Sequence, residues 1–125
     1  MIINMTPHPV NIITNSTFDA SIRKWVAPSD TAPTVTIPST GVLNAKIATI
    51  DADPIGDIPI FTKSITGCDP LPDLGDGDFV IVSALFATAF RAMGGDCSRI
   101  LLVADPVMTP DGKTFLGCRG LTPVF

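Results

Sequence analysis

The clearest pattern along the chain is an apolar run that passes directly into a helical segment. Phe79–Val82 is a short apolar run typical of a buried strand, and Ser83 is a good helix N-cap before a stretch that ends at Gly94-Gly95. Apolar residues cover a broad surface of that stretch: Leu85, Phe86, Ala89, Phe90, Ala92 and Met93. The pattern predicts a strand followed by a helix over residues 83–93.

A second apolar run follows this helix and leads into a turn. Ile100–Ala104 predicts another buried strand, and Pro106–Cys118 predicts a hairpin around Asp111-Gly112, because Asp-Gly pairs favour tight turns. The helix between the two strands is expected to supply the core against which the other strands pack. The apolar tail Leu121–Phe125 is expected to dock on another surface.

Short β patterns fill the N-terminal half of the chain. Ile2–Met5 and Val10–Thr14 predict a first hairpin, with His8 at its proline-flanked turn. Further strands are expected at Thr34–Pro38, Val42–Ile50 and Ile58–Ile65. At Ala20–Val26 a strand is favoured over a helical turn.

The alternation within Val42–Ile50 assigns its two faces. The side that carries Leu43, Ala45, Ile47 and Thr49 is expected to face the core. Asp51–Gly56 is expected to be a turn, and residues 67–77, which are rich in glycine, proline and aspartate, a loop.

Together these patterns predict a single α+β domain over residues 1–125. Its core is a twisted, mostly antiparallel sheet of about six to eight short strands around one principal helix. Exposed strand edges and an apolar C-terminus favour self-association, because edges need to be covered.

Composition and charge narrow the function. A chain of 125 residues with 46% apolar residues can bury a core without metal or disulfide support. Its net charge of -4 opposes binding of duplex nucleic acid, so an anionic ligand would need a local cluster of cations.

Three cysteines without C-x-x-C spacing fit a reducing compartment, and there is neither a basic leader nor a membrane-length apolar run. The sequence predicts a cytoplasmic protein.

The usual catalytic and metal signals are weak. His8 is the one histidine, so structural zinc is not expected, and it could act as a base on Ser39, Ser83 or a cysteine only if the fold brought them together. The acidic residues 73–78 lack the spacing and the distal glutamate of a calcium loop, which favours a surface turn. Phosphate-loop, dinucleotide and zinc-protease motifs are absent, and no cofactor is expected.

Candidate ligand contacts come from the helix and from isolated arginines. Arg91 lies in an apolar helix, where its charge needs an acid, a carbonyl or a ligand anion, and Asp96 and Asp105 are possible partners. Phe86 and Phe90 lie one turn apart on that helix. An aromatic ring near a guanidinium can hold a base and a phosphate, although core packing is the commoner role of either ring.

Two more arginines lie outside the helix. Arg23 and Lys24 are adjacent to Trp25, and Arg119 lies within Gly117–Gly120, where flanking glycines allow a close approach of backbone to ligand. The candidate ligand contacts are therefore Arg23, Phe86, Phe90, Arg91 and Arg119.

Three short segments together resemble a known family. They are Ile3–Val10, with the sequence I-N-M-T-P-H-P-V, then Ile81–Leu85, and the Asp111-Gly112 turn with Gly117–Leu121. The segments resemble small phage and bacterial proteins that begin with an N-x-T-P-H strand, and among these the first-described Thoeris anti-defence sponge family. Residues 15–78 are not part of the resemblance.

The resemblance implies a non-catalytic phage protein of the infected host cell that sequesters cyclic ADP-ribose isomers or other cyclic nucleotides. It implies a homo-oligomer, a dimer or a hexamer built from dimers, in which an aromatic ring stacks on adenine and arginines bind phosphate or ribose. By position, Arg119 corresponds to the C-terminal arginine and Arg23 to an N-terminal one. Phe90 is the expected stacking ring beside Arg91, and Phe86 is the alternative.

Two other function classes stay open from the sequence. One is a small nucleotide-processing hydrolase or lyase with His8 as base, although no second catalytic residue has recognisable spacing. The other is a structural or protein-binding phage protein whose oligomer buries Thr122–Phe125.

Overall fold

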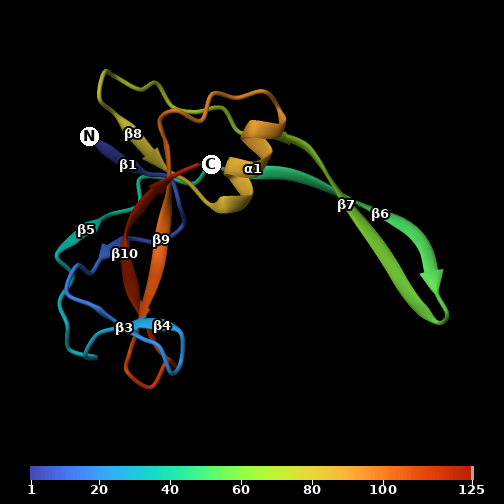
Figure 1. The fold of residues 1–125 in the computed structure, drawn as a ribbon. Helices are drawn as coiled ribbons and strands as arrows, with labels where there is room; N and C mark the ends of the chain where they lie inside the picture. The colour runs from blue at the N-terminus through green and yellow to red at the C-terminus, as the bar shows by residue number, and fades with distance from the viewer. Residues whose placement is uncertain (125) are drawn as a thin grey trace.

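The computed structural model describes residues 1–124 and shows a sheet-rich body from which a two-stranded arm extends (Figure 1). The elements in chain order are β1 (Ile2–Asn4), β2 (Val10–Ile12), β3 (Thr17–Asp19), β4 (Lys24–Val26), β5 (Val35–Ile37), β6 (Ala45–Ile55), β7 (Ile58–Cys68), β8 (Phe79–Ile81), α1 (Ala84–Ala92), β9 (Ile100–Met108) and β10 (Phe115–Pro123). Within this described part, no helix is long and apolar enough to cross a membrane.

The body is one sheet with the strand order β1-β8-β9-β10-β2-β5, and β4 joins β3 to β9. A bridge between Asn4 and Ser39 brings the end of β1 beside the chain after β5, so the sheet nearly closes on itself. The α+β class is confirmed. The sheet of the body is mixed: four of its seven strand pairs are parallel, although most of the paired residues lie in the three antiparallel pairs. One parallel pair, β8–β9, follows from the α1 crossover between its strands.

The helix begins where the sequence predicts. Ser83 Oγ accepts a hydrogen bond from the Phe86 backbone N–H at 3.1 Å, which confirms the N-cap. Phe86, Ala87 and Ala89 are buried. Phe86 and Ala87 pack over Val80 and Ile100 of the adjacent strands.

The core has three parts rather than one centred on the helix. The helix covers the first part, and the other two lie within the sheet, around Ile81 and Cys118 and around Ile13 and Val107. In Figure 1 α1 lies at one end of the body, where the arm begins. Val124 packs on the helical part of the core, as expected for an apolar tail. Phe125, the other end of that expected docking segment, lies outside the described residues.

The expected first hairpin does not form. β1 pairs with β8, and β2 pairs with β10 and β5, so the two strands belong to different places in the sheet. The buried Asn4 side chain holds the proline-rich corner between them by donating to the carbonyls of His8 (2.9 Å) and Ile37 (3.0 Å). The corner therefore separates β1 and β2 instead of folding one back on the other.

β6 and β7 form a long antiparallel hairpin, the arm, around Gly56-Asp57. Gly56 has φ +59°, which suits the first position of a type II′ turn. Asp51–Ile55, expected to be part of a turn, belongs to β6. The expected core face of this strand is also wrong: Leu43 is buried before the strand begins, but Ile47 is 39% exposed because the arm leaves the body.

The β9–β10 hairpin around Asp111-Gly112 is confirmed. The Asp111 carboxylate accepts from the Thr109 hydroxyl and the Lys113 backbone N–H, and these bonds, the hydroxyl first, lower the pKa of that carboxyl. A Cβ at Gly117 would lie 2.5 Å from the Asn11 carbonyl oxygen, so glycine is needed for β10 to approach β2.

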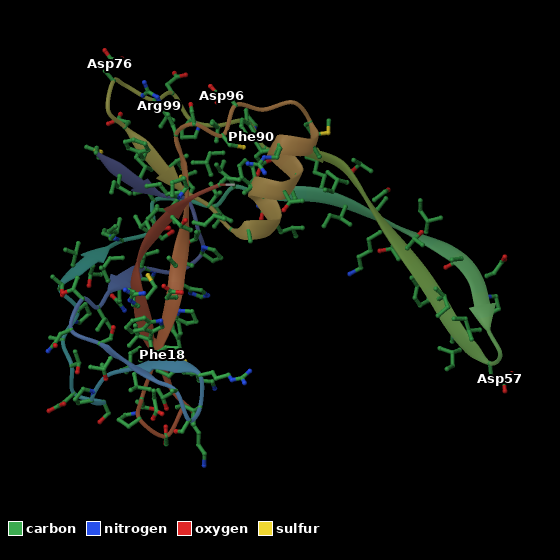
Figure 2. All side chains as sticks on the ribbon, viewed as in Figure 1. Phe18, Asp57, Asp76, Phe90, Asp96 and Arg99 are labelled. Atoms are coloured by element: carbon green, nitrogen blue, oxygen red, sulfur yellow. The ribbon has the colours of Figure 1, made fainter. Side chains whose placement is uncertain are left out.

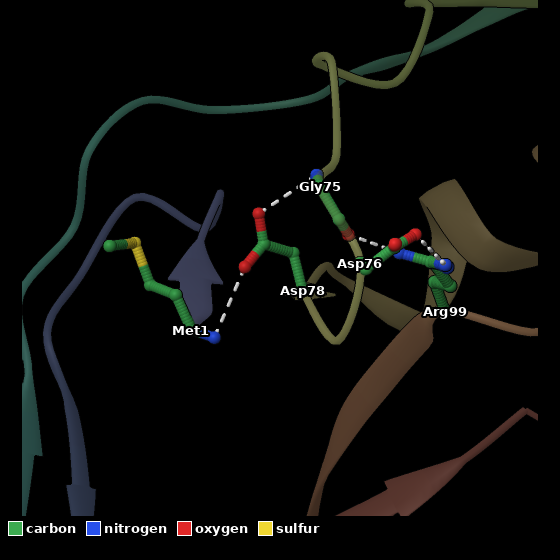
Figure 3. Close-up of polar contacts among 5 residues, drawn as sticks. All are labelled: Met1, Gly75, Asp76, Asp78 and Arg99. Atoms are coloured by element: carbon green, nitrogen blue, oxygen red, sulfur yellow. Dashed lines mark hydrogen bonds and ion pairs between the residues drawn. The ribbon is translucent and has the colours of Figure 1, made fainter.

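The acidic segment is a structural loop, as expected (Figure 3). Asp78 accepts from the Gly75 backbone N–H at 2.9 Å and lies 3.1 Å from the Met1 ammonium, and these contacts lower the pKa of its carboxyl. Arg99 donates to the Gly75 carbonyl and lies 4.0 Å from Asp76. Among the residues that the structure describes, no group of histidine, cysteine, aspartate or glutamate side chains is arranged to hold a metal.

Candidate functional site

Two residues predicted as ligand contacts from opposite ends of the sequence lie at one end of the body. Arg23 precedes β4, which pairs with β9, and Arg119 lies on β10, which also pairs with β9. Trp25 on β4 lies between them. The Arg119 guanidinium carbon is 3.6 Å from the centroid of the Trp25 ring, a close cation–π contact.

Asp105 holds the guanidinium in this place. It lies opposite Arg119 on β9, and Arg119 Nη1 donates to Asp105 Oδ2 at 2.8 Å. The two side chains are 41% and 50% exposed, so the ion pair adds little to stability and its main effect is orientation. Phe18 of β3 meets the Trp25 ring edge-on, with centroids 5.4 Å apart.

These residues border a pocket of about 240 Å³, which we call the basic corner. It is lined by Phe18, Arg23, Lys24, Trp25, Asp105, Pro106 and Met108. Lys24 Nζ donates to the Gly112 carbonyl at 3.1 Å, which ties this second cation to the turn of the β9–β10 hairpin.

The charge of the basic corner is opposite to that of the whole chain. Arg23 and Lys24 line the corner with one carboxylate, Asp105, whose ion-pair partner Arg119 lies against Trp25. Asp19 lies opposite Lys24 in the β3–β4 hairpin. The Asp19 carboxylate accepts from the Ser21 hydroxyl at 2.6 Å and from its N–H at 2.9 Å, and these bonds lower its pKa. Cations therefore outnumber carboxylates locally, and the corner is a place where an anion can bind an acidic protein.

Backbone strain is concentrated in the same corner. Within residues 1–124, positive φ at a non-glycine residue occurs at Arg23 (54°) and Asp105 (53°), and both line this pocket. Such a conformation costs on the order of 1–3 kcal/mol per residue, and it is typically kept where function needs it. At Arg23 this conformation ends the β3–β4 turn, and at Asp105 it lies inside β9.

Replacing Arg23 with glycine is expected to raise the free energy of unfolding by about 0.5–1 kcal/mol, because glycine adopts positive φ without a Cβ clash. Urea denaturation followed by circular dichroism measures the change. Arg91→Gly is the matched control, and in the last turn of α1 it should lower stability by up to about 1 kcal/mol. A loss of stability in Arg23→Gly would contradict the assignment of strain to this position.

The helical candidates do not join this site. Figure 2 shows Phe90 at the α1 end of the body and Phe18 at the opposite end. Phe86 is fully buried and stacks on Phe90 at 5.6 Å, so it has no ring face open to a ligand. Phe90 is half-buried, and Arg91 is exposed beside Thr88 and Val124.

Sequence reasoning missed Trp25, Phe18 and Asp105 as parts of the site. The adjacency of Arg23, Lys24 and Trp25 in the sequence could have identified Trp25 as an aromatic contact. Asp105 was considered only as a partner for Arg91. The structure pairs Asp105 with Arg119 instead. The carboxylate of Asp96, the other expected partner, accepts from the Ser98 backbone N–H at 2.9 Å.

A larger hollow of about 390 Å³, which we call the groove, adjoins the basic corner and shares Asp105 and Pro106 with it. Its walls come from residues 6–11, the start of α1, β9 and β10, and they are mostly apolar. The groove also brings His8 and Ser83 to one surface, which the sequence left open. Comparison with family models, curated proteins and solved structures gave no significant match.

Proposed function

We propose that the protein is a non-catalytic sponge for cyclic adenine nucleotides of the cyclic ADP-ribose type, which it binds at the basic corner to inhibit Thoeris defence in an infected host cell. The observation that carries the proposal is the Arg119 guanidinium, which Asp105 holds over the Trp25 ring at a strained backbone position. The sequence resemblance supplies the nucleotide class.

The chemistry of the corner suits an anion that carries an aromatic group. A phosphate can take the place of the Asp105 carboxylate, which accepts one hydrogen bond from Arg119, while Arg23 lies at the same pocket. A purine can stack on the Phe18 ring, which is 51% exposed, or on the free face of the guanidinium. We therefore propose Trp25 and Phe18 as the aromatic contacts, and Phe90 with Arg91 as the alternative position on α1.

The size of the pocket sets how much of the ligand it holds. At about 240 Å³ the basic corner is smaller than the roughly 300–1,000 Å³ of typical ligand pockets. The basic corner of one chain therefore holds one base and one phosphate of the ligand. The rest of the ligand extends along the adjoining surface.

The test is uptake and release of a panel of cyclic ADP-ribose isomers. Each isomer is incubated with the protein, the unbound fraction is removed, and the bound nucleotide is released by heat and analysed. Arg119→Ala should raise the dissociation constant about 10- to 100-fold, as expected for loss of a charge-assisted hydrogen bond. Trp25→Ala should weaken uptake similarly, and Arg91→Ala should leave it unchanged.

The outcomes separate the possible functions. Intact nucleotide in stoichiometric amount supports the sponge, and no depletion of any isomer contradicts it. Altered nucleotide would establish an enzyme, and because His8 and Ser83 line one groove, His8→Ala should then abolish turnover. Loss of uptake in Arg91→Ala with normal uptake in Arg119→Ala would move the site to α1.

A further inference from the structure

The arm is a feature that the nucleotide proposal does not use. Its two strands of 11 residues extend about 35 Å, and the arm packs on α1 near its base before leaving the body (Figure 1). A two-stranded hairpin on its own is at best marginally stable in water, so a hairpin of this length needs another surface to cover it.

One face of the arm is uncharged. Its cross-strand pairs are Ala48–Ser64, Ile50–Thr62 and Ala52–Ile60. Beyond them, near the turn, Ile55 pairs with Ile58. These two residues are 70% and 63% exposed. Contiguous exposed apolar residues of this kind are typical of a surface that binds another protein.

The end of the arm is also acidic. Asp51, Asp53 and Asp57 lie between Lys46 and Lys63, and the intervening residues contain no cation. The tip of the arm, residues 51–58, therefore combines two exposed isoleucines with three carboxylates.

The body carries the complementary surface. The groove is apolar and includes Val103 and Phe115, which are 52% and 63% exposed. It continues at Asp105 and Pro106 into the basic corner with Arg23 and Lys24. An acidic segment with apolar side chains fits this combination in both shape and charge.

The arm cannot fill the groove of its own chain, because it points away from the body, with Asp57 at its far end (Figure 2). We propose that the arm of one copy docks its tip in the groove of a second copy, with its carboxylates beside the basic corner. This interface goes beyond the proposed function and does not rest on it.

The area of the arm favours a reciprocal exchange. One face of about 35 by 10 Å gives roughly 350 Å², which is short of the about 800 Å² per partner of a standard interface. When each copy gives an arm and receives one, the contact doubles and closes as a twofold dimer.

The experiment is size-exclusion chromatography of the full chain with multi-angle light scattering. The wild type should have the mass of two chains, and association should weaken at high salt because of the charge contribution. The double variant Ile55→Asp, Ile58→Asp should raise the dissociation constant more than 100-fold. Val35→Asp, at an apolar position on β5 that is 50% exposed, is the control and should remain a dimer.

A groove variant makes the test specific for the two surfaces. Val103→Asp should also be monomeric. Mixing it with the tip variant should give a heterodimer that associates more weakly than the wild type but more strongly than either variant alone, because one of the two contacts, an intact tip in an intact groove, is present. Circular dichroism checks that each variant is folded, and the tip variant alone is decisive if Val103→Asp does not fold. A monomeric wild type, or a tip variant that associates like the wild type, would overturn the proposal.

Discussion

Replacing Asn4 with leucine is expected to lower the free energy of unfolding by about 3–4 kcal/mol, a large fraction of the stability of a typical domain. Asn4 is fully buried. Its Nδ2 donates to the carbonyls of His8 and Ile37, and its Oδ1 accepts from the Thr6 N–H at 3.0 Å and hydroxyl at 2.6 Å. Leucine fills a similar volume but removes the partners of the Ile37 carbonyl and the Thr6 N–H, at about 1–3 kcal/mol each, while the His8 carbonyl keeps the Thr6 hydroxyl as a donor.

Urea denaturation followed by circular dichroism measures this loss. Thr6→Val, which removes only the hydroxyl, should cost about 1 kcal/mol, and Asn15→Leu, at an exposed turn, should change little. A change of under about 1 kcal/mol in Asn4→Leu would mean that water replaces the lost partners, and that the corner is not held by this side chain.

Asn4 also shows why the sheet closure could not be predicted. Its bonds to Ile37, and the bridge from Asn4 to Ser39, join segments that are more than thirty residues apart in the sequence. Local patterns predicted the helix after Ser83 and the Asp111-Gly112 hairpin correctly, since both are fixed by caps and turns within a few residues. Parallel pairs such as β1–β8 have no such local signal.

The arm illustrates a different limit. Alternation within Val42–Ile50 predicted a strand, but the strand begins at Ala45 and its apolar residues do not face the core of their own body. A period-two pattern reports that one face is suited to burial, and it cannot report which surface buries that face. The turn was also misplaced: Asp51–Gly56 was expected to be a turn, but β6 continues through Pro54, which is tolerated because an isolated hairpin has two free edges.

The candidate site was predicted in pieces. Arg23 and Arg119 were chosen separately, and β9 brings their strands together. The ring was sought on α1 because Phe86, Phe90 and Arg91 are close in the sequence, whereas Trp25 reaches Arg119 only through pairing of β4 with β9. Positive φ at Arg23 and Asp105 has no sequence signal, because neither residue is the glycine that such a backbone favours.

Phe86→Ala is expected to lower the free energy of unfolding by about 3–5 kcal/mol, since the ring is fully buried and its loss leaves a cavity beneath α1. Phe90 is half-buried, so Phe90→Ala should cost less, about 1–2 kcal/mol. Both are measured by urea denaturation, with Leu85→Ala, 52% exposed on the same helix, as the control near zero.

The same two variants test which ring contacts the ligand. Under conditions where each variant is folded, neither should change nucleotide uptake if the basic corner is the site, because both rings lie at the α1 end of the body. Loss of uptake in Phe90→Ala with little loss of stability would instead identify Phe90 as a stacking ring. Phe86→Ala with a stability near that of the wild type would contradict its place in the core and reopen both rings on α1 as ligand contacts.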